Sequence, residues 1–121
     1  HPLSFLGPES QLAANAAGCA ADQGKFLDFH KTLFANQPRE NSGTWNSSYF
    51  STLSLVLGIS DEAYDKCVAN NDYKDWVVNV ANEAAKRNVN STPTVLINGK
   101  EIDRNVAYNS LAEFMLAVSK A

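Results

Sequence analysis

The fold of this chain is decided by the stretch Ser91-Thr92-Pro93-Thr94-Val95-Leu96-Ile97-Asn98-Gly99-Lys100-Glu101-Ile102. Asn98-Gly99 separates two β-prone runs, and this dipeptide favours a two-residue type I′ turn because both of its residues must adopt positive φ. The stretch therefore predicts an antiparallel hairpin with strands at 94–97 and 100–103. Pro93 lies just ahead of the first strand, where its missing N–H group removes no ladder hydrogen bond.

The chain has 121 residues, of which 45% are hydrophobic and 19% are charged, with a net charge of −3. A chain of this length is expected to form one domain with its own hydrophobic core. The acidic balance offers no basic surface, so nucleic acid is not an expected partner. No apolar run approaches the roughly 20 residues of a membrane-spanning helix. The chain has neither an initiator methionine nor a signal-peptide pattern at His1, so we expect it to be cut from a longer protein.

Two cysteines, Cys19 and Cys67, are far apart in the sequence and form no Cys-x-x-Cys pair. From the residues alone, two buried free thiols and a disulfide are about equally supported, because free cysteine packs as a small hydrophobe and a disulfide requires an oxidising compartment. A zinc site is the weakest alternative, since His1 and His30 supply no close ligand pairs. We therefore expect no metal and no cofactor.

A hydrophobic period of about 3.6 residues predicts five helices before the hairpin and one after it. They are expected at about 8–21, 26–36 and 47–57, from residue 60, at 72–88 and from residue 110. Ser60 is the expected N-cap of the fourth helix, with Asp61 and Glu62 favourable to its dipole. Ser110 and Glu113 form a capping box for the last helix. Four residues of that helix are expected to lie inside: Leu111, Phe114, Met115 and Val118.

His30 lies on the apolar stripe of the second predicted helix. No acid or cysteine neighbours it at helical spacing. A packed, partly buried histidine is therefore favoured over a catalytic one.

The predicted hairpin lacks neighbouring strands. The run Val95-Leu96-Ile97 is apolar without alternation, which is typical of a strand buried on both faces. A two-stranded hairpin is marginal by itself, and the one upstream run that could match its strength is Leu3 to Leu6. We expect the missing strands to come from a preceding segment, or from another copy by strand exchange or dimer formation.

Three groups of motifs, taken in their order and spacing along the chain, resemble a DsbA-like protein of the thioredoxin-fold superfamily. The resemblance covers nearly all 121 residues. Residues 16–26, with His30 and 33–38, are similar to the start of that family's inserted helical domain. Leu57-Gly58-Ile59 and Cys67 resemble its middle helices, and the run from Ala84 through Thr92-Pro93 to Val95 resembles its cis-proline loop.

The resemblance implies an α/β, thioredoxin-like fold with an inserted helical domain. The insertion would span about 8–90, and the cis-proline loop, hairpin and final helix about 91–121. The family's Cys-x-x-Cys segment and N-terminal strands are absent from this chain, so no catalytic residue can be assigned to it. Asn90 stands where the family often has glycine, which asparagine can replace because it tolerates positive φ.

The resemblance also implies roles for four residues. The Thr92–Pro93 peptide bond is expected to be cis, and the backbone of Thr92 is expected to pair with an extended substrate, which makes Thr92 and Pro93 the expected substrate-binding residues. Cys19 and Cys67 are expected to form a structural disulfide, because some members of the family have a second cysteine pair at matching positions.

Three functions follow from these expectations. The first is a thiol–disulfide oxidoreductase of the cell envelope, with extended cysteine-containing polypeptides as substrates and a membrane redox partner for the parent protein. The second is a redox-inactive extracytoplasmic binding or sensor domain, and the third is a helical interaction domain with an accidental resemblance. The expected location is extracytoplasmic (periplasm, cell envelope or secreted), with membrane anchoring through the missing N-terminus. The sequence preceding His1 would separate the first two functions.

Overall fold

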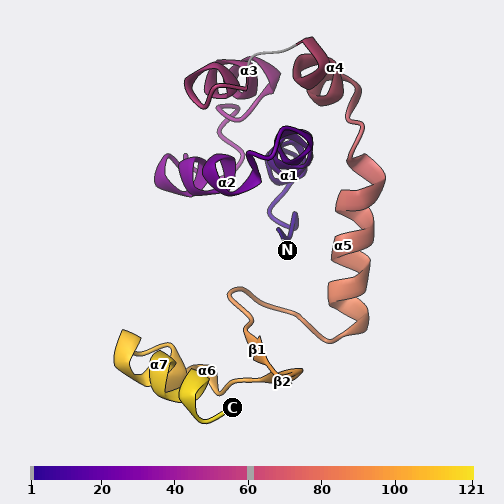
Figure 1. Cartoon of the computed structure of the whole chain (residues 1–121). Helices are drawn as coiled ribbons and strands as arrows, with labels where there is room; N and C mark the ends of the chain where they lie inside the picture. Colours follow the sequence, from indigo (N-terminus) through magenta and orange to yellow (C-terminus); the bar gives the residue numbers. More distant parts are fainter. Residues whose placement is uncertain (1, 60–61) are drawn as a thin grey trace. The chain divides into compact units, whose positions relative to one another are not determined.

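The computed structural model describes residues 2–59 and 62–121 (Figure 1). Within them the chain forms seven helices and one two-stranded antiparallel sheet near the C-terminus. The predicted fold class, mostly helical with a C-terminal hairpin, is confirmed. The chain divides after Glu83 into two compact units, and each is described by itself. No helix in the described ranges is both long and apolar enough to cross a membrane.

The first unit is built around one alanine-rich helix. Its helices are α1 (Pro8–Asp22), α2 (Phe26–Ala35), α3 (Ser47–Val56), α4 (Glu62–Asn70) and the start of α5 (Lys74–Lys86). α1 contacts α2, α3 and α4, which surround it in Figure 1. Every residue from 13 to 20 is buried. Because alanine strongly favours helix and carries only a methyl group, α1 forms readily and lets its neighbours approach closely.

Three aromatic rings hold the neighbours of α1 together. Phe29 of α2 lies at the centre, with ring centroids 6.3 Å from Phe50 of α3 and 6.2 Å from Tyr64 of α4. All three side chains are fully buried. Tilted aromatic pairs at this separation are favourable beyond the area that they bury. This cluster and the small residues of α1 make the core of the unit.

The helix boundaries agree closely with those predicted. α4 begins at Glu62 in the described residues, and its predicted N-cap, Ser60, and first-turn residue, Asp61, lie outside them. α5 begins two residues later than predicted and ends before Asn88, which adopts positive φ. A single residue at positive φ beyond the last turn is a common way for a helix to end.

The second unit contains the hairpin. β1 (Leu96–Ile97) and β2 (Lys100–Glu101) pair antiparallel, with Ile97 opposite Lys100. Asn98 and Gly99 both have positive φ, at 51° and 80°, as the predicted type I′ turn requires. The hairpin prediction is confirmed, with shorter strands than expected.

Two helices follow the hairpin, α6 (Arg104–Ala107) and α7 (Leu111–Ser119). α6 was not predicted, and Asp103 caps it by accepting a hydrogen bond of 2.9 Å from the backbone N–H of Asn105. The predicted cap of α7 is confirmed, because Ser110 Oγ accepts from the Glu113 N–H at 3.2 Å. Such caps satisfy donors that lack a partner within the helix.

Leu96 is 52% exposed, and its burial inside a sheet stays a prediction, because the covering strands are expected from outside this chain. The burial predicted for the last helix is wrong. α7 has no buried residue: Leu111, Met115 and Val118 are exposed and Phe114 is half-buried. The reason is physical, since the described sheet has two strands and leaves the faces of β1 without covering layers, and α7 packs chiefly on the short α6.

Candidate functional site

The loop from Ser91 to Val95, which leads into β1, carries the predicted substrate-binding residues. The Thr92–Pro93 peptide bond is cis, which is the geometry that the resemblance implies. Thr92 and Pro93 are both exposed, whereas Ser91, Thr94 and Val95 are partly buried. The loop therefore presents its middle to solvent and is held at both ends.

The backbone of Thr92 makes no hydrogen bond within the described part of the chain, through either its N–H or its C=O. Its neighbours do. The Val95 N–H donates to Tyr108 Oη at 3.0 Å, and the Ser91 carbonyl accepts from the Thr94 hydroxyl at 2.6 Å. An exposed donor and acceptor on one residue, with bonded residues on each side, can pair with an extended peptide as an added strand.

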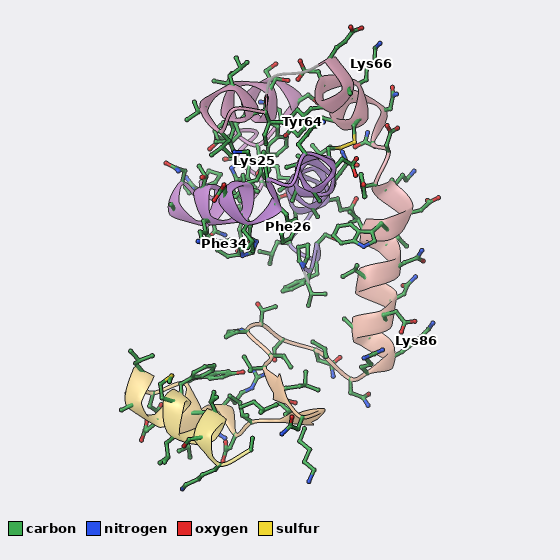
Figure 2. The ribbon with its side chains drawn as sticks, viewed as in Figure 1. Lys25, Phe26, Phe34, Tyr64, Lys66 and Lys86 are labelled. Atoms are coloured by element: carbon green, nitrogen blue, oxygen red, sulfur yellow. A yellow bond between two sulfur atoms is a disulfide. The ribbon has the colours of Figure 1, made fainter. Side chains whose placement is uncertain are left out.

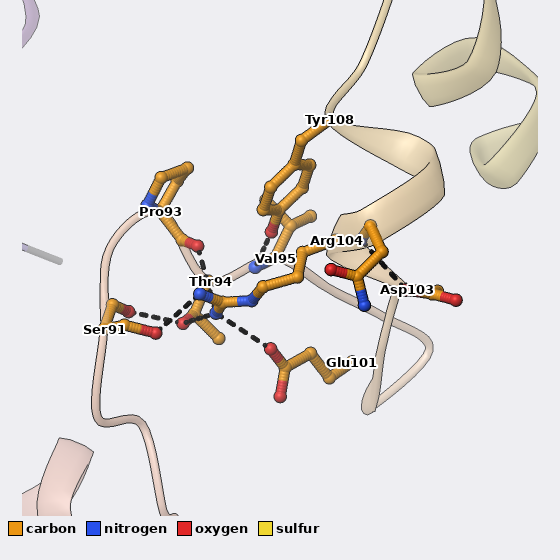
Figure 3. Close-up of polar contacts among 9 residues, drawn as sticks. Ser91, Pro93, Thr94, Val95, Glu101, Asp103, Arg104 and Tyr108 are labelled. Carbon is orange, nitrogen blue, oxygen red and sulfur yellow. Dashed lines mark hydrogen bonds and ion pairs between the residues drawn. The ribbon is translucent and has the colours of Figure 1, made fainter.

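Arg104, the first residue of α6, holds the loop from one side (Figure 3). Its Nη1 donates to Ser91 Oγ at 2.6 Å. Its Nη2 lies 3.2 Å from Thr94 Oγ1 and 3.4 Å from the Pro93 carbonyl oxygen. The same Nη2 forms an ion pair of 3.1 Å with Glu101 of β2. One guanidinium thus connects residues on both sides of Thr92 with the hairpin.

Tyr108 supports the same arrangement. It follows α6 directly, and its hydroxyl accepts the Val95 N–H where the loop enters β1. The Arg104 guanidinium carbon lies 6.0 Å from the centre of the Tyr108 ring, within the range of a cation–π contact. α6 therefore places both side chains against the loop, and the Asp103 cap fixes where α6 begins.

Sequence reasoning missed Arg104 and Tyr108. Their contacts join residues that lie 10 to 13 positions apart, and no periodic pattern connects residues across a hairpin. One signal was present. Asp103 is a good N-cap directly after a strand, and positions 104 and 108 have the i, i+4 spacing that puts a cation and an aromatic ring on one helix face.

The two cysteines form a disulfide between α1 and α4, drawn as the yellow bond in Figure 2. The Cα atoms of Cys19 and Cys67 are 5.9 Å apart. Both side chains are buried, with exposures of 1% and 8%. The pairing that the resemblance implies is present, and it leaves the chain with no free cysteine. No thiolate is therefore available for attack on another disulfide while this bond is intact.

A polar cluster lies beside the disulfide. Asn15 is buried, accepts from the Tyr73 N–H at 2.9 Å and points its amide at Cys19 Sγ from 4.0 Å. The Tyr73 hydroxyl donates to the Asp22 carboxylate. That hydrogen bond is the main cause that raises the pKa of Tyr73, with smaller contributions from burial and from the charges of Asp22 and Asp72. The cluster joins α1 to the start of α5.

His30 packs between two aromatic rings on α2. Its ring centroid lies 5.9 Å from that of Phe26 and 4.8 Å from that of Phe34, which Figure 2 labels. His30 is partly buried. In the described part of the chain, no group of three or more His, Cys, Asp or Glu side chains is placed to hold a metal ion. These contacts agree with the interpretation of His30 as a packed histidine.

Comparison with known proteins gives one family and several relatives. A family model described as "Thioredoxin" matches residues 2–116. A protein of Mycobacterium sp. (strain KMS) named "Na(+)/H(+) antiporter NhaA 1" is 35% identical over 101 residues, and its namesake in Mycolicibacterium gilvum (strain PYR-GCK) is 31% identical over 101 residues. Each alignment covers 82% of this chain and 16% of the relative, so the chain spans about a sixth of the relatives' length. No solved structure matches the chain.

Proposed function

The chain belongs to the thioredoxin family, and from that premise we propose that it is part of a thiol–disulfide oxidoreductase of the DsbA-like branch. In this proposal the 121 residues supply polypeptide recognition at the 91–95 loop. Thr92 and Pro93 are the residues that meet the substrate. The proposal draws on family membership, on the order of segments that resembles DsbA-like proteins, and on the exposed loop.

One observation carries the recognition role, namely the unbonded backbone of exposed Thr92 between bonded neighbours. A backbone N–H and C=O that no part of the protein uses are hydrated when the site is empty. An extended chain can exchange that water for two main-chain hydrogen bonds, and such pairing depends little on the partner's sequence. The proposed partners are extended polypeptide segments near cysteine residues, as expected for an enzyme that acts on many proteins.

The chemistry proposed for the whole protein is thiol–disulfide exchange. A thiolate attacks one sulfur of a disulfide, a mixed disulfide forms, and the other sulfur leaves as a thiolate; a second thiolate then resolves the mixed disulfide. The attacking thiol must be accessible and have a lowered pKa. Cys19 and Cys67 are buried and joined, so the proposal gives them a structural role and assigns the redox pair to residues outside these 121.

The proposed location is extracytoplasmic, with a membrane redox partner for the whole protein. Structural disulfides persist in oxidising compartments and are rare where thiols are kept reduced. The Cys19–Cys67 bond supports the proposal for this reason.

A second candidate is a redox-inactive binding or sensor domain attached to a membrane protein. It is favoured by the names of the curated relatives, which are antiporters in which the matched segment makes up 16% of the length. In that case the 91–95 loop would bind a polypeptide without any redox step. The codons that precede His1 in the gene separate the candidates, since a Cys-x-x-Cys pair there favours the enzyme.

A peptide titration tests the recognition role that both candidates share. The probe is a short peptide of alternating Thr and Val around one S-methylcysteine, with Lys at each end. We expect its binding to shift the backbone amide NMR signals of residues 91–94 first. A matched probe, N-methylated at every residue, keeps the side chains but loses all its main-chain donors and should not bind. Equal binding of both probes, or shifts confined to other segments, would contradict the proposal.

A further inference from the structure

We infer that Arg104 is a positioning residue of the peptide-binding loop: it holds residues 91–94 in the accepting conformation and makes no contact with the bound peptide. The site consequently accepts acidic and basic extended segments alike. This inference rests on the proposed recognition role of Thr92. It adds which side chain maintains the site and which property of the substrate the site ignores.

The hydrogen bonds of Arg104 show which way its guanidinium acts. Ser91, before Thr92, and Thr94, after Pro93, both accept from it, at 2.6 and 3.2 Å. The Thr94 hydroxyl donates its hydrogen bond to the Ser91 carbonyl at 2.6 Å, so toward Arg104 the hydroxyl oxygen can act only as an acceptor. A planar guanidinium offers several donors in a fixed fork and spans such a set of acceptors, whereas a lysine ammonium does not. Arg104 therefore connects the two ends of the 91–94 segment, at Ser91 and at Thr94.

The charge of Arg104 is also occupied. Glu101 Oε1 lies 3.1 Å from Nη2. Nη1 donates to Ser91 and the Nη2 group is shared among Glu101, Thr94 and the Pro93 carbonyl, so both terminal nitrogens of the guanidinium are directed at the protein, although the side chain is 36% exposed. A residue that selected acidic peptides would instead present an unpaired cation at the exposed side of the loop. The ion pair thus points to support of the loop.

Tyr108 completes this support at the other end. Its hydroxyl oxygen accepts a hydrogen bond from the Val95 N–H at 3.0 Å. Without that acceptor, the Val95 N–H would be a further unbonded donor of the loop, beside those of Thr92 and Thr94, and the register of an added strand would be less well defined. In the described part of the chain Thr94 also has an unbonded backbone N–H and C=O, but it is partly buried, so Thr92 is the exposed residue of this loop whose backbone is open on both its donor and its acceptor.

The test compares three variants of the full chain with two probes. The probes are the peptide described above, with Lys at each end, and the same peptide with Glu at each end. We expect Arg104→Gln to weaken both probes by the same factor, about tenfold, since several hydrogen bonds to the loop are lost. Arg104→Lys should restore little of that loss, because an ammonium lacks the planar fork. Lys100→Gln removes a positive charge from the same hairpin, away from the loop, and should change neither affinity by more than about twofold.

A readout in the unbound protein separates support of the loop from loss of folding. Tyr108→Phe keeps the ring and removes only the acceptor, so the Val95 amide should exchange with solvent faster while the amides of α1 keep their rates. Arg104→Gln should raise the mobility of residues 91–94, seen by backbone NMR relaxation, with α7 unchanged. If these local changes are absent, the inference is wrong.

The outcomes for peptide binding are also distinct. If Arg104→Gln weakens the Glu-ended probe far more than the Lys-ended one, and salt removes the difference, Arg104 contacts the ligand and the inference is overturned. If the wild-type chain binds both probes and Arg104→Gln binds each of them with the wild-type affinity, the inference alone is wrong. If the wild-type chain binds neither probe, the proposed function is wrong and the inference falls with it.

Discussion

Tyr73 packs against Gly18 so closely that a Cβ atom on Gly18 would lie 2.5 Å from Tyr73 Cγ. Gly18 sits in the interior of α1, beside Cys19 of the disulfide. In that position glycine costs helix stability relative to alanine, so its presence there needs a reason. The reason is space for Tyr73, which also bonds to Asn15 and Asp22 and thereby joins the start of α5 to α1.

Replacing Gly18 by alanine should lower the free energy of unfolding. Alanine would gain about 1 kcal/mol in helix propensity. The clash with the Tyr73 ring should cost about 1–3 kcal/mol. The new methyl group would meet Cβ, Cγ and Cδ1 of Tyr73, which lie close to the backbone, and the Tyr73 N–H is itself bonded to Asn15. The expected net change is a loss of up to about 2 kcal/mol, measured by urea denaturation.

The matched control is the same change in a Tyr73→Ala background. There the obstacle is gone, and Gly18→Ala should raise the free energy of unfolding by about 1 kcal/mol. An alanine that stabilises both backgrounds equally would show that Tyr73 does not restrict position 18.

The Tyr73–Asp22 hydrogen bond should make stability depend on pH in the alkaline range. The bond raises the pKa of Tyr73 in the folded chain above its ordinary value of about 10. A group whose pKa rises on folding stabilises the fold fully below the unfolded pKa, and this stabilisation is lost as pH climbs through the folded pKa. Tyr73→Phe should therefore cost roughly 0.5–1 kcal/mol at neutral pH, a small value because the pair is exposed, and progressively less above about pH 10.

The measured quantity is the difference in unfolding free energy between the wild type and Tyr73→Phe at each pH. The difference is needed because burial also raises the pKa of Tyr64, which affects both proteins equally. A difference that stays constant through the alkaline range would contradict a role for the Asp22 bond.

The disulfide should contribute more to stability than any single side-chain contact. Cys19 and Cys67 are separated by 48 positions, and closing such a loop removes denatured-state entropy worth about 4 kcal/mol in the chain-entropy account. The double variant Cys19→Ala, Cys67→Ala should be destabilised by about that amount in denaturant unfolding. Dithiothreitol present during denaturant unfolding should lower the stability of the wild type, whose disulfide becomes accessible as the chain unfolds, and should leave the stability of the double variant unchanged. Equal stability of the two proteins without reductant would contradict the structural role.

The same buried bond should not turn over substrate. We expect these 121 residues to leave the rate of insulin reduction by dithiothreitol at its uncatalysed level, since Cys19 and Cys67 are inaccessible and buried structural disulfides have potentials below about −300 mV. Turnover by the wild-type chain that is lost in Cys19→Ser or Cys67→Ser would make them the catalytic pair and overturn the assignment.

Local chemistry explains which parts of the fold could be predicted from sequence. Asn98-Gly99 fixed the hairpin because few other residues accept positive φ twice in succession. Ser110 fixed the start of α7 through its side-chain oxygen. Both signals lie within a few residues of the structure that they determine.

Burial and the loop contacts depended on distant partners and could not be predicted in the same way. Leu96 and Met115 are apolar, yet they are exposed because no described element covers them. α6 has four residues, too few for a hydrophobic period to appear. Arg104 was missed for a related reason, since its role comes from a loop on the far side of the hairpin.

The backbone of Thr92 tests the account most directly, through the hydrogen-exchange rate of its amide measured by NMR. In the unbound chain Thr92 is an exposed residue and its amide is unbonded, so the amide should exchange rapidly. On saturation with the Lys-ended probe the rate should fall about tenfold or more, because the amide becomes bonded to the added strand, while amides of the 37–46 loop keep their rates. A Thr92 amide that exchanges equally fast with the probe bound would contradict recognition by strand addition at this site.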